Sequence, residues 1–140
     1  MDKLLSAFIA VALSTAVVAG HHSFAAEDDA SNQITLVGTI TKVEWTNPHT
    51  WFFIDVKDPQ GQVVNWAIEG GAPTVLYREG WKPTSLKAGD QVTVTIALAK
   101  DKSKKQGNAY QFKLPDGRCV FAGSSGPSGG ATDNCTPGRR

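Results

Sequence analysis

The three histidines of the chain are the residues whose type and position most favour a chemical site. His21 and His22 are adjacent, and His49 follows an Asn-Pro pair further along the chain. If an N-terminal leader is removed after Gly20, His21 carries the free α-amine and can chelate a metal through that amine and its ring. A further imidazole, from His22 or His49, would complete a set of three nitrogen ligands. Such a set suits Cu(II), the tightest binder among the divalent first-row metals.

Other interpretations of these histidines stay open. Zinc would need a fourth ligand, for which Glu27 or Asp28 is available. Alternatively, the two adjacent histidines belong to a solvated arm and His49 caps a turn, with no metal bound. The amine–ring chelate also depends on the cleavage position, because a cut that leaves Gly20 first removes the free amine from the first histidine.

The sequence contains no strong catalytic motif. The acidic residues near predicted strands are Glu44, Asp55, Glu69 and Asp90, and no pair of them has the spacing of an acid–base couple. There is no nucleophile elbow, phosphate-binding loop, dinucleotide fingerprint or CxxCH haem motif. We therefore predict a non-enzymatic protein. A small redox enzyme using bound copper is the enzymatic alternative, and it would require an open coordination position.

Aromatic residues gather in the first half of the chain. The candidates for an exposed aromatic face cluster in the first three predicted strands: Trp45, Trp51, Phe53 and Trp66. Exposed rings on a β-sheet can stack on bases or sugar rings. We predict that Trp45, Asn47 and Trp51 shape a pocket beside His49, and the alternative is that the rings pack in the core.

The charge balance of the chain bears on its partners. Fourteen basic residues nearly balance 13 acidic ones, and the formal net charge is +1. A nucleic-acid-binding domain normally carries a basic excess, so nucleic acid is not the expected partner. The lysines at 100, 102, 104 and 105 are typical of a solvated loop. The partners that we expect are a metal ion or a periplasmic protein.

The first 20 residues have the pattern of a secretory signal peptide. Lys3 gives a basic start, residues 4–18 are largely apolar, and small residues precede the predicted cleavage point. A membrane span needs about 20 apolar residues, so this stretch is at the short limit, and no later segment is long enough. We predict a periplasmic or secreted protein without a membrane segment after cleavage. An uncleaved N-terminal anchor is the alternative.

The two cysteines, Cys119 and Cys135, fit an exported protein. In an oxidising compartment they can form a disulfide, and closing a loop of this length stabilises the fold by about 3 kcal/mol. The alternative is two unpaired thiols. A zinc site built on them is disfavoured because no second pair of ligands accompanies them.

Alternating hydrophobic residues predict a β-rich domain with one short helix. The first strand runs from Gln33 to Trp45, with a bulge near residues 41–42 where the alternation slips by one position. A short helix is expected at 72–79, after the Gly70-Gly71 break, and a polar loop at 101–108. The other strands are expected at 50–57, 62–69, 92–98, 110–114 and 118–121.

Three strands, a short helix and further strands follow the order of the OB fold. We therefore predict an all-β protein with one short helix, a small OB-like antiparallel β-barrel of five to six strands. An unrelated small barrel or sandwich is the alternative. The expected organisation is a signal peptide (1–20), an N-terminal arm (21–32), the barrel (33–122) and a disordered Gly/Ser-rich tail (123–140).

Several of these stretches resemble a known family. The matching motifs are His-His-Ser-Phe-Ala at 21–25, Val-Glu-Trp-Thr-Asn-Pro-His-Thr-Trp at 43–51, Asn-Trp-Ala-Ile-Glu-Gly-Gly at 65–71, and shorter stretches at 80–81, 86–90 and 114–118. Over about residues 21–124 the chain is similar to small exported bacterial proteins catalogued as domain of unknown function 6152. The resemblance implies export, an OB-like barrel and a site at the His-His start and the Asn-Pro-His corner, with no established activity. The cysteine pair and the long tail depart from the family pattern.

These observations together predict an exported, periplasmic binding module. His21, His22 and His49 are its candidate copper ligands. The alternative is a non-metal accessory protein that docks a partner protein or a saccharide through its aromatic face.

Overall fold

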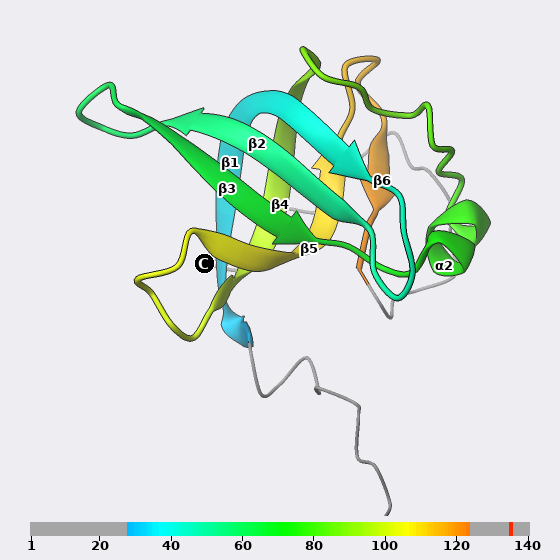
Figure 1. Cartoon of the computed structure of the whole chain (residues 1–140), viewed down its shortest axis with the longest axis horizontal. Coiled ribbons are helices and arrows are strands. Elements are labelled where there is room, and N and C mark those ends of the chain that lie inside the picture. Colours follow the sequence, from blue (N-terminus) through cyan, green and yellow to red (C-terminus); the bar gives the residue numbers. More distant parts are fainter. Residues whose placement is uncertain (1–27, 124–134, 136–140) are drawn as a thin grey trace, which may run out of the picture.

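The computed structural model describes residues 28–123 and residue 135, and this part of the chain contains six strands and one short helix (Figure 1). Helix α2 (Pro73–Arg78) lies between the third and fourth strands. The strands are β1 (Asp28–Glu44), β2 (Trp51–Lys57), β3 (Val63–Glu69), β4 (Gln91–Ala99), β5 (Gln106–Lys113) and β6 (Cys119–Phe121). The prediction of an all-β fold with one short helix is confirmed.

The sheet closes in a ring. Its strands are hydrogen-bonded in the order β3-β2-β1-β4-β5-β6, and β3 also pairs with β5. That closing pair is parallel, with Ala67–Glu69 beside Gln106–Asn108, while the other strand pairs are antiparallel. The order of elements and the closure fit the predicted OB-like arrangement. Figure 1 shows α2 at one end of the ring, beside the loop that leads into β2.

The core is formed by the inward-facing side chains of the strands and by several residues outside them, of which Trp81 is the largest. Trp81 is buried, and its ring centroid lies 5.4 Å from that of Phe52 and 5.6 Å from that of Phe112. Its Nε1 donates a hydrogen bond of 2.7 Å to the carbonyl of Phe121. Because its polar atom has a partner, Trp81 contributes apolar contact area without leaving a buried donor unsatisfied.

Helix α2 begins and ends where the sequence predicts, to within one residue at each end. Pro73 occupies its first turn, where a missing N–H costs no helical hydrogen bond. Gly80 follows the helix with a φ of +91°, a conformation that glycine adopts without strain. Leu76 is completely buried, and a helix this short depends on such packing rather than on its own propensity.

The predicted bulge in β1 is confirmed. The register between β1 and β2 shifts between Ile40 and Lys42. The backbone of Ile40 is hydrogen-bonded at both its groups to the turn at 87–90: its N–H donates to Asp90 and its carbonyl accepts from Gly89, each at 2.8 Å. The bend of β1 is therefore held by the turn that precedes β4.

Two strands begin four or more residues earlier than the sequence predicts. β1 starts at Asp28, so residues 28–32 of the predicted arm belong to the strand. Between Asp29 and Gln33 the register of β1 against β4 shifts. β5 starts at Gln106, inside the predicted loop at 101–108, because its first residues close the ring on β3. Neither stretch has alternating apolar residues. Backbone pairing with neighbouring strands, which sequence patterns do not report, places them in the sheet.

Gly70 and Gly71 lie where three segments of backbone approach closely. A Cβ on Gly71 would stand 2.5 Å from the carbonyl oxygen of Gly123, and one on Gly70 would stand 2.8 Å from the ring of Phe52. The N–H of Gly71 donates to Ala122 at 2.8 Å. The two glycines are therefore required by packing as well as by the end of β3.

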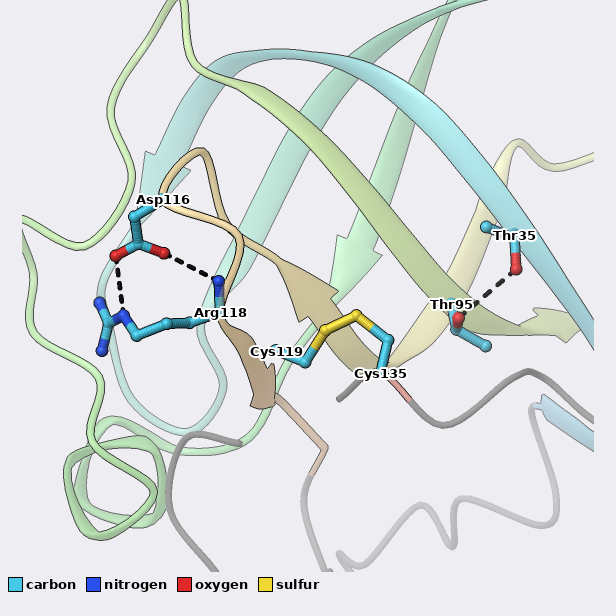
Figure 2. Close-up of a disulfide and its surroundings, with 6 residues drawn as sticks. All are labelled: Thr35, Thr95, Asp116, Arg118, Cys119 and Cys135. Atoms are coloured by element: carbon cyan, nitrogen blue, oxygen red, sulfur yellow. Dashed lines mark hydrogen bonds and ion pairs between the residues drawn. A yellow bond between two sulfur atoms is a disulfide. The ribbon is translucent and has the colours of Figure 1, made fainter. Parts of the chain in front are cut away.

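A disulfide joins Cys119, at the start of β6, to Cys135 (Figure 2). Their Cα atoms are 5.2 Å apart, within the usual range for the bond. Of the predicted tail, only Gly123 and Cys135 are described. The predicted signal peptide and residues 21–27 of the predicted arm lie outside the described residues. Within the described part of the chain, no helix has the length and apolar character needed to cross a membrane.

Candidate functional site

Strand alternation sorts the predicted aromatic cluster into two groups. Trp45 and Trp66 pack against the hydrophobic core and are partly buried. On β2, Phe52 points inward and is completely buried, so Trp51 and Phe53 stand on the opposite, outer side of the sheet, where they are half-buried. The structure therefore separates Trp45 from Trp51, and only Trp51 shares a face with Phe53.

His49 lies on the same outer face, two residues before the start of β2. The β2–β3 pairing continues past Trp51, because the N–H of Gly70 donates to the carbonyl of Thr50 at 2.8 Å. Thr50 is completely buried, so His49 and Trp51 on either side of it face outward. Glu69 stands directly opposite Trp51 on β3. Nδ1 of His49 is in contact with Oε1 of Glu69.

The His49–Glu69 pair is positioned at the solvent boundary. The His49 side chain is 40% exposed and the Glu69 side chain 18% exposed. A carboxylate that accepts the Nδ1–H of histidine fixes the orientation of the ring and leaves Nε2 as the nitrogen directed toward a ligand. The pair thus has the arrangement in which proteins present a histidine to a metal or to a polar ligand.

Charged residues of β1 border the aromatic rings on their other side. Glu44 stands opposite Trp51, and Lys42 stands opposite Phe53. The ammonium of Lys42 lies 5.5 Å from the centre of the Phe53 ring and is ion-paired with Glu44. Trp51 therefore has a glutamate opposite it on each neighbouring strand, since Glu69 is its partner on β3.

A hydrogen-bonded set of polar side chains continues this face along the sheet. Nδ2 of Asn65 donates to Oδ1 of Asp55 at 2.8 Å and to the hydroxyl of Thr41 at 3.2 Å. The hydroxyl of Thr41 in turn donates to the carbonyl of Phe53 at 3.2 Å. These contacts link β1, β2 and β3 across the outer side, so the polar groups beside the aromatic rings have defined positions.

The loop between β1 and β2 carries the other predicted pocket residue, Asn47. Asn47 is exposed and precedes Pro48 through a cis peptide bond. Trp45, at the start of the loop, meets Tyr77 of α2 edge-on, with ring centroids 5.6 Å apart. The loop is thus packed against the helix on one side and presents Asn47 to solvent.

The predicted metal ligands are only partly described. His49 is placed, whereas His21 and His22 lie outside the described residues. Among the described residues, no three His, Cys, Asp or Glu side chains come close enough to hold a metal ion. His49 and Glu69 could supply one ligand and its supporting carboxylate, so a complete site would need ligands from elsewhere.

The sequence did not single out Glu69 as the partner of His49. It lies 20 positions further along the chain, and no spacing rule for helices or strands connects the two. Alternation does predict that Glu69 faces outward, since Ile68 beside it is apolar and completely buried. The pairing of β2 with β3 then decides which residue of β2 it meets.

Two of the family-like motifs, at residues 86–90 and 114–118, form hydrogen-bonded turns of the fold. Leu86–Asp90 forms the turn that holds the bulge, and Lys87 donates two hydrogen bonds to Asp90, from its backbone N–H and from its ammonium. At 114–118, Arg118 donates to both oxygens of Asp116 across a tight turn (Figure 2). These hydrogen bonds, chiefly the one from the Arg118 side chain, lower the pKa of Asp116. Hydrogen bonds within the fold therefore account for the positions of these charged residues.

The lysine-rich loop between β4 and β5 contains a hydrogen-bonded turn at residues 101–104. Asp101 accepts hydrogen bonds from the N–H and hydroxyl of Ser103, at 3.1 and 2.6 Å. The ammonium of Lys105 lies 5.6 Å from the centre of the Trp66 ring. Lys102 and Lys104 are exposed, as a solvated loop predicts.

Comparison with known proteins identifies the family and nothing more specific. No curated protein and no solved structure matches the chain. A family model, described as a family of unknown function (DUF6152), matches residues 9–109. The match covers the motifs at 21–25, 43–51 and 65–71, which contain the histidines and Glu69, and it ends before the turn at 114–118. Because it spans well over half of the 140 residues, the chain belongs to the DUF6152 family.

Proposed function

We propose that this protein is an exported, non-enzymatic binding module that binds Cu(II) through His49 together with His21 and His22. The contact between His49 and Glu69 carries the proposal. Histidines that bind metals usually donate their second ring N–H to a carboxylate or a carbonyl, which orients the ring and makes it a better ligand. Glu69 supplies such a carboxylate on the outer face of the sheet.

The N-terminal histidines are close enough along the chain to share a site with His49. Through β4 and β5, the strand pairing separates Asp28 from Glu69 by three interstrand steps. That distance is about 14 Å across the sheet and about 7 Å along it. His21 precedes Asp28 by seven positions, and an extended chain of that length spans up to about 25 Å. The N-terminal amine and ring of His21 could therefore meet Nε2 of His49.

Two features support export. The apolar segment at residues 4–18 with small residues after it is typical of a cleaved leader. The disulfide between Cys119 and Cys135 is a bond that persists in oxidising compartments and is rare in the cytosol. Cleavage after Gly20 would make His21 the first residue, which the amine–ring chelate requires.

The test combines mass spectrometry with a copper titration. Mass spectrometry of the exported protein is expected to show His21 as its first residue. Calorimetric titration with Cu(II) should then show one tight site, weakened at least tenfold in His49→Ala. Lys42→Ala, which changes a residue of the same face and no histidine, is the matched control. A different first residue, or equal copper affinity of wild type and His49→Ala, would overturn the proposal.

A second candidate function is docking of a partner through the aromatic face. The specific observation in its favour is that Trp51 and Phe53 are not part of the hydrophobic core, although both are half-buried. Aromatic rings that the core does not use are typical of recognition surfaces. This function requires no metal, so it would survive failure of the copper titration.

A further inference from the structure

The outer side of β2 forms a small aromatic surface bordered by polar groups. We call it the β2 face and define it by six residues: Lys42, Glu44, Trp51, Phe53, Asn65 and Glu69. Strand pairing places a charged residue of β1 opposite each ring. On β3, Trp51 faces Glu69, and Phe53 faces the small residue Ala67. Trp51 thus has a glutamate as its cross-strand partner on each side, and Phe53 has the small residue Ala67 as its partner on β3.

Charge argues against two classes of ligand for this face. Within the β2 face two carboxylates, those of Glu44 and Glu69, stand opposite Trp51, against the one ammonium of Lys42. A phosphate backbone would be repelled by this excess of negative charge. A protein interface would have a core depleted of charged residues, whereas here charged residues are the direct neighbours of the rings.

The combination of flat rings and hydrogen-bond acceptors suits a neutral ligand rich in hydroxyl groups. The faces of aromatic rings carry partial negative charge, which attracts the polarised C–H groups on the flat side of a sugar ring. Carboxylates accept strong hydrogen bonds from hydroxyl groups. A carboxylate on each side of the indole could therefore receive the equatorial hydroxyls of a sugar stacked on Trp51.

The polar groups of the face are held before any ligand arrives. Lys42 is ion-paired with Glu44 and lies over Phe53, and Asn65 bridges Asp55 and Thr41. His49 holds the carboxylate of Glu69. Groups that are already ordered lose little conformational entropy on binding, which favours recognition by a small set of contacts.

We infer that the β2 face binds a neutral oligosaccharide, with one sugar ring stacked on Trp51 and its hydroxyls bonded to Glu44 and Glu69. Phe53, two residues further along β2, is placed to contact the neighbouring sugar. The inference rests on the second candidate function, docking through the aromatic face, and names its ligand class. It is independent of copper binding.

The test titrates the full exported chain with a panel of neutral hexasaccharides: cellohexaose, maltohexaose, chitohexaose and mannohexaose. Calorimetry is expected to detect binding of at least one of them. Trp51→Ala should weaken that binding about tenfold or more, in line with the loss of an aromatic stacking partner. Trp51→Phe, which keeps a flat ring, should retain most of the affinity.

Matched controls separate a specific face from non-specific stacking. Tyr77→Ala removes an exposed ring on α2, outside the β2 face, and should leave the affinity unchanged. A charged comparator, a hexamer of galacturonic acid, should bind more weakly than the neutral sugar. Near-ultraviolet circular dichroism of each variant establishes that the variant is folded.

Three results would overturn the inference: no binding to any neutral hexasaccharide, equal affinity of folded Trp51→Ala and wild type, or preference for the acidic hexamer. The titrations are run in a metal chelator. Saccharide binding in the chelator together with a failed copper titration would refute the metal site alone. Copper binding without any saccharide binding would refute the present inference alone.

Discussion

Nδ1 of His49 is in contact with Oε1 of Glu69, although His49 lies in the loop before β2, Glu69 ends β3, and the two residues are 20 positions apart. The contact exists because β2 and β3 pair so that Trp51 faces Glu69, and because Thr50 extends that pairing by one further residue. The contact with Glu69 gives the His49 ring a defined orientation. The copper site proposed above depends on that orientation.

Glu69→Gln should lower the affinity for Cu(II) about 10- to 100-fold, the usual effect of losing a carboxylate that supports a metal-binding histidine. The amide can still meet the ring, but it carries no charge to increase the basicity of the imidazole. Calorimetric titration checks this. Asp55→Asn, a matched loss of charge on the same side of the sheet, should leave copper affinity unchanged, and equal affinities of Glu69→Gln and wild type would contradict the role of Glu69.

Gly71→Ala should destabilise the fold by roughly 1–3 kcal/mol, the range found for overpacked sites. A Cβ at this position would stand 2.5 Å from the carbonyl oxygen of Gly123, and that backbone cannot move without disturbing Gly71's own hydrogen bond to Ala122. Urea denaturation measures the change. If the two glycines were only a flexible break, the same substitution would stabilise the fold by about 0.4–1 kcal/mol. The sign of the change in the free energy of unfolding therefore distinguishes close packing from a flexible break.

A suitable control for that substitution is Gly61→Asn in the turn between β2 and β3. Gly61 has a φ of +82°, a Cβ there would meet no atom within 4 Å, and asparagine tolerates that conformation. Its effect should stay within about 0.5 kcal/mol, as for most surface substitutions.

Cys135→Ser should lower the free energy of unfolding by about 2–4 kcal/mol, because it opens the loop that the disulfide closes. Cys119→Ser should cost more, since Cys119 is only 2% exposed and the new hydroxyl would be buried. Urea denaturation of both variants gives the comparison. Wild-type protein in a reducing agent should resemble Cys135→Ser, and unchanged stability after reduction would show that the bond does not support the fold.

Asp90 should make the stability of the protein depend on acidity. A side-chain hydrogen bond from Lys87, joined by one from the Lys87 backbone, lowers the pKa of Asp90 below its ordinary value of 3.8. Because the folded pKa is the lower one, the ionised carboxylate stabilises the fold above pH 3.8, and this contribution is lost as the pH falls through the lowered value.

The measurement compares wild type with Asp90→Asn by urea denaturation over a range of pH. Wild type should be the more stable at neutral pH, and the two proteins should converge in strong acid. In a Lys87→Met background the difference at neutral pH should shrink. A difference between wild type and Asp90→Asn that is the same at all pH values would contradict this account.

Local patterns determined a large part of the fold. Alternating apolar residues located β2, β3 and β4, and the slip in that alternation located the bulge at Ile40–Lys42. Proline and glycine marked both ends of α2. These features depend on neighbours within a few residues of each other, so the order of the residues is enough to reveal them.

Long-range pairing decided the remainder. The polar starts of β1 and β5 are strands only because partner strands supply their hydrogen bonds, and the parallel closure of β3 on β5 makes the sheet a ring. Sequence alone identified His49 and Trp51 as candidate site residues and grouped Trp45 with them. Only the register of β2 against β1 and β3 placed Trp45 toward the core, set Trp51 between Glu44 and Glu69, and brought His49 to its carboxylate, because side-chain alternation and strand pairing act across segments far apart in the chain.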